Sequence, residues 1–172
     1  SGVTIEGDAP WLGALPSGDG LRILVTDQAI AGDETTLVYH PQTYALGLGC
    51  ERGAADTISL AREVLAAADI APGAVACIAS LDIKSDEPAL AALAAELGVP
   101  LRVFPATRLE QETPRLSDPS ETVFREVGCH GVAEGATLAC VGEDGALVVT
   151  KRKRDGVTCA LARAAAPLDA ST

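Results

Sequence analysis

Aromatic residues make up only 3% of this sequence, and methionine is absent. Because 48% of the residues are nevertheless hydrophobic, the core must be built from Ala, Val, Leu and Ile. Such a core favours helices packed on a sheet. No apolar run approaches the roughly 20 residues that a membrane-spanning helix needs. A basic segment followed by an apolar one is also missing at the start, so we expect no secretory signal.

Basic residues are scarce as well. The chain has 13 Lys and Arg against 24 Asp and Glu, which gives a net charge of -11. This balance argues against nucleic acid and against anionic membranes as partners. An anionic small molecule would be repelled at long range, so its site must supply positive charge locally.

The chain has five cysteines, and their spacing is not that of a disulfide framework. Their number is odd and no Cys-x-x-Cys pair occurs, so neither a disulfide scaffold nor a zinc site is expected. A reducing cytoplasm is the simpler interpretation. The five are Cys50, Cys77, Cys129, Cys140 and Cys159.

The pattern of hydrophobic residues predicts one α/β domain, which suits 172 residues. Strands are predicted at 21–26, 37–39, 44–49, 75–81, 101–104, 146–151 and 157–163. Helices are predicted at 55–68, from an N-cap at Ser85 to 97, at 121–127 and at 132–140. The alternation indicates right-handed crossovers, and Asp155-Gly156 indicates a closing hairpin. We therefore predict a three-layer α/β/α fold with a mixed, mainly parallel sheet and a C-terminal β-hairpin.

The first candidate site is the strand-to-helix turn at residues 47–53, which reads GLGCERG. Its glycines permit a tight backbone, and the amides of the following helix would form an anion site with Arg52. The spacing G-x-G-x-x-x-G is one residue longer than the dinucleotide fingerprint. The alternative is a turn that needs glycine only for its geometry. Cys50 lies beside Arg52 in a setting that lowers a thiol pKa, but a small core residue is the alternative.

The second candidate is the segment 80–87, which should lie at the same sheet edge. If the strand continues, Asp82 and Lys84 share one side and could supply an acid or base and an anion anchor. The alternative is a capped helix start with solvated charges.

The third candidate is the basic run 151–154, in which Lys151 and Lys153 would share one face. It would bind a polyanionic ligand or form a solvated hairpin tip. Cys129-His130 is not expected to bind metal, because adjacent residues point apart in an extended chain.

These segments together resemble the C-terminal domain of the CbiG/CobE family of cobalamin biosynthesis. The matching segments are GLGCERG, SLDIKSDEPAL, LGVPLRVF, PSETVFREVG, GVAEGATL and LVVTKRKRDGVTCALAR, in order from 47 to 163. The resemblance implies an N-terminal arm or tail of a middle region at 1–43 and the family domain at 44–163. The small and polar residues at 164–172 predict a loose tail. Ala54 and Ala55 stand where the family often has a hydroxyl residue. We expect the chain to be a piece of a longer polypeptide, either a CbiG-like protein or a fusion with precorrin-3B C17-methyltransferase.

The resemblance implies binding of a precorrin or cobalt-precorrin intermediate. One version is part of a cobalt-precorrin-5A hydrolase, which opens a lactone and releases acetaldehyde. The alternatives are a non-catalytic module that assists the methyltransferase and a Rossmann-like nucleotide binder. No metal or other cofactor, no nucleic acid and no membrane is expected, and other cobalamin-pathway enzymes are the expected partners.

The predicted catalytic residues are Asp82 and Glu87. The predicted ligand-binding residues are Gly47, Gly49, Cys50, Glu51, Arg52, Gly53, Lys84, Ser120, Glu134, Lys151 and Lys153.

Overall fold

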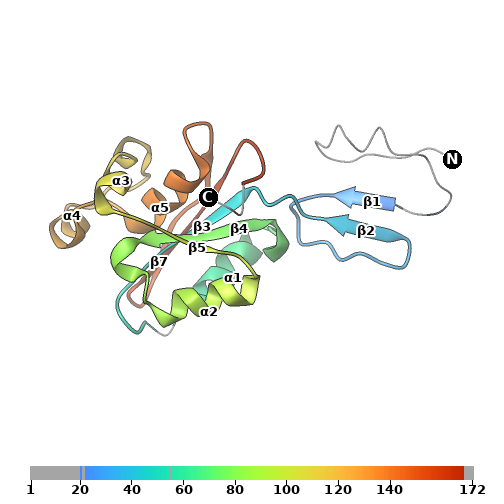
Figure 1. Ribbon diagram of the computed structural model, residues 1–172, viewed down its shortest axis with the longest axis horizontal. Helices are drawn as coiled ribbons and strands as arrows, with labels where there is room; N and C mark the ends of the chain where they lie inside the picture. The colour runs from blue at the N-terminus through green and yellow to red at the C-terminus, as the bar shows by residue number, and fades with distance from the viewer. Residues whose placement is uncertain (1–19, 21, 55, 169–172) are drawn as a thin grey trace.

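The computed structural model describes residues 20, 22–54 and 56–168 (Figure 1). Trp11 and the first 19 residues of the predicted arm lie outside the described residues, as do the last four residues of the predicted tail. Within the described residues, no helix is both long and apolar enough to cross a membrane.

A five-stranded mixed sheet forms the middle layer, in the order β5-β4-β3-β7-β6. Its strands are β3 (Tyr44–Cys50), β4 (Val75–Leu81), β5 (Leu101–Phe104), β6 (Ala146–Arg154) and β7 (Val157–Arg163). Strands β3, β4 and β5 are parallel, whereas β7 is antiparallel to β3 and to β6. The predicted hairpin therefore joins the parallel strands through β7.

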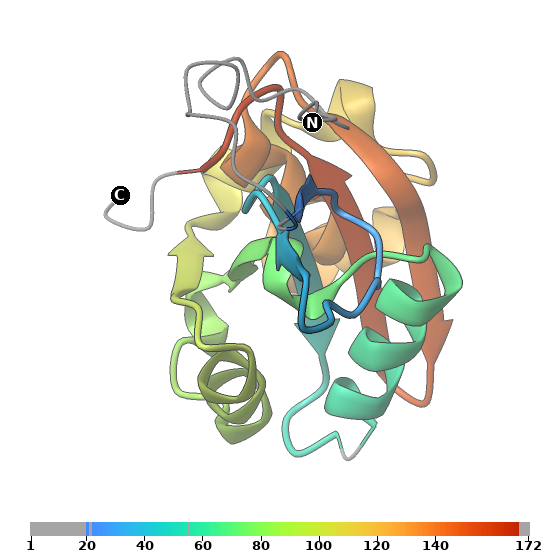
Figure 2. The same cartoon turned by 90° about the vertical axis from the view of Figure 1, so that its right-hand side faces the viewer.

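Helices cover both faces of this sheet (Figures 1 and 2). On one face, α1 (Thr57–Ala67) and α2 (Pro88–Leu97) pack on Leu46, Leu48 and Leu161. On the other face lie α3 (Ala106–Glu110) and α5 (Val132–Val141), with the short helix α4 (Glu121–Val127) beyond the sheet edge. The predicted three-layer arrangement is confirmed.

Two further strands, β1 (Arg22–Val25) and β2 (Thr36–Tyr39), pair in parallel as a separate sheet. They project from the end of the molecule opposite to α4 (Figure 1). A cleft of about 1000 Å³ lies beside them, lined by Leu24, Ile30, Thr43, Arg163 and their neighbours. This cleft is at the amino end of β3, away from the carboxyl ends of the parallel strands.

Local signals explain most helix ends. Gly98 and Gly128 have φ angles of 67° and 80° and terminate α2 and α4 in the left-handed conformation that glycine favours. Ser120, which was predicted to bind ligand, caps α4, and its side chain accepts a hydrogen bond from the Val123 amide. The N-cap of α2 is Glu87 and not Ser85, because residues Asp82–Lys84 form a 3₁₀ helix whose last turn includes Ser85. Helix α3 was missed.

Strand β6 is irregular. Its pairing with β7 shifts between Leu147 and Val149 and again between Val149 and Arg152. As a result, Leu147 packs on the α5 side of the sheet, whereas Val149 packs with the α1 and α2 core.

Candidate functional site

The turn after β3 and the loop after β4 meet at the carboxyl edge of the parallel strands, as the sequence predicts. The amide of Gly53 donates to Glu87 Oε1 at 3.2 Å. The Arg52 guanidinium lies 3.3 Å from the Asp86 carboxylate and 3.4 Å from the carbonyl of Ile83. The first and second candidate segments therefore form a single region of the surface.

Arg52 is the most accessible cation of this turn. Its side chain is 66% exposed and that of Asp86 is 68% exposed. An ion pair so open to solvent contributes little to stability. Arg52 can therefore exchange Asp86 for another anion at small cost.

Glu87 is buried, being only 3% exposed, although it is ionisable. Its carboxylate accepts the Gly53 amide and thereby fixes the turn on the α2 N-terminus. Asp82 differs, because it is exposed and lies in the 3₁₀ helix. The prediction that Asp82 and Lys84 alternate along a continued strand is wrong, because the strand ends at Leu81.

Lys84 is half-buried, and its positive charge acts to lower the pKa of the Cys50 thiol. Burial nevertheless dominates and raises the pKa of the Cys50 thiol, with Glu87 adding to the rise. Of the two interpretations of Cys50, the small core residue is therefore favoured over a nucleophile with a lowered pKa.

Gly47 and Gly49 lie inside β3 beneath α5 rather than facing solvent. A Cβ atom on Gly47 would overlap the carbonyl oxygen of Ala133, and one on Gly49 would approach Thr158 and Val132. Helix α5 can pack this closely on the sheet only because both positions lack a side chain. Their glycines thus have a packing role.

The backbone amides of the turn are mostly used within the protein. Glu51 donates to the carbonyl of Gly156 at 2.9 Å, and Ala54 donates to that of Glu51 at 3.3 Å. The Gly53 amide is bound to Glu87. These three amides therefore already have partners within the protein. Gly53 itself has a φ of 75° with open space around it, so glycine serves the backbone conformation there.

Glu134, in the first turn of α5, is buried and fully engaged. It accepts hydrogen bonds from the amide and hydroxyl of Ser117 and from the amide of Lys151 at 2.7 Å. The carboxylate thus joins α5, β6 and the loop before α4, and no oxygen is turned to a ligand.

The basic side chains of residues 151–154 in the hairpin point to different faces of the sheet and find different partners. Lys151 pairs with Asp118 at 2.8 Å, while Arg154 on the other face pairs with Glu63 of α1 at 2.7 Å. Lys153 lies opposite Thr158, which in turn lies opposite Gly49. Among the described residues, neither Lys84 nor Lys153 has an ion-pair partner within 4.0 Å.

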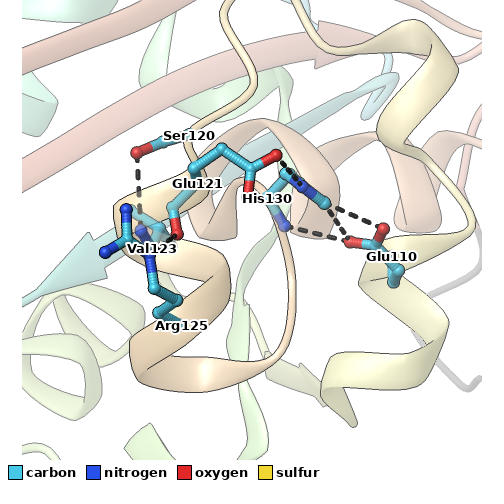
Figure 3. Close-up of polar contacts among 6 residues, drawn as sticks. All are labelled: Glu110, Ser120, Glu121, Val123, Arg125 and His130. Carbon is cyan, nitrogen blue, oxygen red and sulfur yellow. Dashed lines mark hydrogen bonds and ion pairs between the residues drawn. The ribbon is translucent and has the colours of Figure 1, made fainter.

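A polar cluster of His130 with Glu110 and Glu121 was missed by sequence reasoning (Figure 3). His130 Nδ1 lies 2.9 Å from Glu110 Oε1, and its Nε2 lies 3.3 Å from Glu121 Oε1. The Glu110 carboxylate is the main cause that raises the pKa of His130, and Glu121 adds to it. No local signal in the sequence pairs residues this far apart. Across the described residues, no cluster of three or more His, Cys, Asp or Glu side chains is arranged to hold a metal ion.

Comparison with known proteins identifies the family. Residues 44–162 match the family model described as "Cobalamin synthesis G C-terminus". The chain belongs to this family. It is thus a cobalamin-biosynthesis domain related to CbiG, and the resemblance predicted from six segments is confirmed. The methyltransferase and nucleotide-binding alternatives gain no support.

Two curated proteins of cobalamin biosynthesis are similar to this chain. Protein CobE of Sinorhizobium sp is 48% identical over 119 residues, which cover 68% of this chain and 77% of that protein. The cobalt-precorrin-5A hydrolase of Priestia megaterium is 28% identical over 156 residues. Those residues cover 87% of this chain but only 41% of the hydrolase.

Solved structures share the fold. CobE from the cobalamin pathway superposes with a TM-score of 0.63 and 34% identity, over 72% of this chain and 91% of that one. The cobalamin biosynthesis protein chiG from Agrobacterium tumefaciens str. C58 superposes with a TM-score of 0.55 and 29% identity. The match covers 71% of this chain and 98% of that one. A cobalamin biosynthesis protein G homolog from Sulfolobus solfataricus gives 0.56 over 95% of this chain and 49% of that one. Its 18% identity supports the fold alone.

Proposed function

We propose that this domain binds a corrin-ring precursor at the carboxyl edge of β3 and β4. There it would take part in, or assist, lactone opening of the cobalt-precorrin-5A hydrolase type with acetaldehyde release. The supporting observation is the meeting of the turn 50–54 with the loop 82–87, which places exposed Arg52 next to Ile83 and Lys84 near Cys50. The activity of the hydrolase relative reaches this chain only as a proposal, because the chain spans less than half of it.

The chemistry of the ligand matches this edge. Corrin precursors are broad apolar rings fringed with carboxylates, so their site needs apolar surface rimmed by cations. Arg52, Lys84 and Lys153 supply positive charge in a chain of net charge -11. Ile83 is 52% exposed and supplies apolar surface beside Arg52.

The two acidic residues take different roles. Asp82 is exposed, so its carboxylate can reach a water beside a bound lactone and act as the general base. Glu87 is buried against Gly53 and positions the turn. As the water oxygen attacks the lactone carbonyl, its proton passes to Asp82, and Arg52 or Lys84 lies near the developing oxyanion. The ring C–O bond then breaks, and the leaving alkoxide oxygen takes the proton back from Asp82.

The binding test is a visible-spectrum titration with cobyrinic acid, a stable corrinoid with free carboxylates. We expect Arg52→Ala and Lys84→Ala each to weaken binding about tenfold, since each removes a charge-assisted hydrogen bond. Arg62→Ala is the matched control, because Arg62 is an equally exposed arginine that pairs with Glu96 on the outer side of α1 and α2. The absence of binding at about 50 μM ligand would refute the proposal.

The catalytic test measures acetaldehyde release from cobalt-precorrin-5A by the full-length parent protein. Asp82→Asn should lower kcat with little change in corrinoid affinity. Equal turnover in Asp82→Asn and the parent protein would remove Asp82 from the mechanism.

A further inference from the structure

Helix α4 carries an exposed aromatic ring at the same end of the molecule as the turn 50–54 (Figure 1). None of the α4 residues is buried, and the Phe124 side chain is 40% exposed. One face of this ring stacks on His130, with ring centroids 4.5 Å apart and planes at 21°. The other side of the phenyl ring is therefore partly open to solvent.

His130 is held by contacts from several elements (Figure 3). Its ring in turn stacks on Phe124. Its amide and its Nδ1 both contact the Glu110 carboxylate of α3, at 3.0 Å and 2.9 Å. Its carbonyl accepts the amide of Ser120 at 2.8 Å, at the start of α4. Its Nε2 faces Glu121. The exposed phenyl ring is thus held on a rigid base, whereas an incidental surface Phe has no such support.

We propose that Phe124 is a ligand contact on which a flat, conjugated macrocycle stacks, and that His130 is the residue that positions it. This inference rests on the proposed function, because it names a second wall of the same corrin site. Offset stacking on an aromatic face suits a conjugated ring, while the peripheral carboxylates of that ring find Arg52, Lys84 and Lys153. The two walls come from different parts of the chain: one is the turn 50–54 before α1, and the other is α4, which follows α3.

The charges around His130 make this wall sensitive to pH. Glu110 of α3 and Glu121 of α4 face the two ring nitrogens, and Arg125 contacts the backbone carbonyl of Glu121. The adjacent Cys129 is buried, and burial raises the pKa of its thiol. The imidazolium form of His130 satisfies both carboxylates, and its deprotonation removes one of the two contacts.

The test compares corrinoid binding by Phe124→Ala, Phe124→Trp and the parent protein. We expect Phe124→Ala to weaken cobyrinic acid binding about fivefold and Phe124→Trp to retain it. Val148→Ala is the control, because Val148 is 48% exposed but lies near the start of β6 at the far end of the sheet. An upfield shift of the Phe124 ring protons on adding diamagnetic cobyrinic acid would report stacking directly.

The positioning role has its own readout. Affinity of the parent protein should decline as pH rises through the raised pKa of His130, and the affinity of His130→Gln should be independent of pH over that range. A parent protein that binds no corrinoid overturns both the proposed function and this inference. A parent protein that binds, with Phe124→Ala binding equally and no ring-proton shift, overturns this inference alone.

Discussion

The amide of Gly53 donates to the buried carboxylate of Glu87 at 3.2 Å, which joins the turn after β3 to the start of α2. This contact links two of the six sequence segments that carry the family resemblance. Glu87 thus holds the turn in place, whereas Asp82 beside it is exposed and available to a ligand.

Replacing Glu87 by Ala should destabilise the protein by about 1–3 kcal/mol, because the Gly53 amide loses a charged partner. Urea unfolding at neutral pH measures the change. Asp82→Ala is the control, and since Asp82 is exposed we expect its free energy of unfolding to stay within about 0.5 kcal/mol of the parent. Equal stability of the two variants would contradict the assigned division of roles.

Gly47→Ala should be more damaging than Gly53→Ala. A methyl group at residue 47 overlaps the Ala133 backbone and forces α5 away from β3, at a cost of about 3 kcal/mol or more. At residue 53 there is open space, so the cost is the left-handed backbone alone, about 1–2 kcal/mol. Thermal unfolding of both variants gives the order, and the reverse order would mean that the glycines serve the turn rather than the helix packing.

Cys50 should react slowly with iodoacetamide at neutral pH, because burial raises the pKa of its thiol. Lys84→Ala should slow it further, since the ammonium lowers that pKa. Peptide mapping by mass spectrometry follows the rate against pH. Cys159 provides the unreactive reference, because burial raises its pKa to about 12. Rapid modification of Cys50 below the ordinary thiol pKa would restore the nucleophile hypothesis.

The stability contributed by His130 should depend on pH. Its folded-state pKa lies above the usual 6.5, so its contribution is complete below that value and is lost as pH rises through the folded pKa. The pKa of Glu110 is lowered from 4.5, mainly by its hydrogen bond with His130. The stability that Glu110 contributes is therefore present above pH 4.5 and is lost as pH falls through its folded-state pKa. The unfolding free energy of the parent should therefore exceed that of His130→Ala most between these limits. A constant difference from pH 5 to pH 9 would contradict this linkage.

The sequence predicted the parts of the fold that depend on local patterns. The run Val75–Leu81 is apolar except for Ser80 because a central parallel strand is covered on both faces, and the structure has β4 over those residues. Glycines after α2 and α4 likewise indicate where each helix ends. Helix α3 escaped prediction because its five residues are too short to show a helical period.

The site was predicted less well, because its roles depend on contacts distant in sequence. The glycines of β3 resemble a ligand-binding turn. Glycine is required at residue 47, however, because the Ala133 backbone of α5 leaves no room for a side chain there. Glu134 resembles a ligand-facing acid until Ser117 and Lys151 are seen to occupy its carboxylate. The meeting of residues 52–53 with 83–87 was predictable, because the carboxyl ends of adjacent parallel strands share one edge.

The two register shifts in β6 have a consequence for the behaviour of the protein in concentrated solution. As the outermost strand beyond β7, β6 presents unpaired backbone groups to which a strand of another molecule could add. Bulges interrupt the regular spacing of those groups, and the adjacent Arg152 and Lys153 are exposed. Charge and irregularity of this kind protect an edge against intermolecular sheet growth and hence against aggregation.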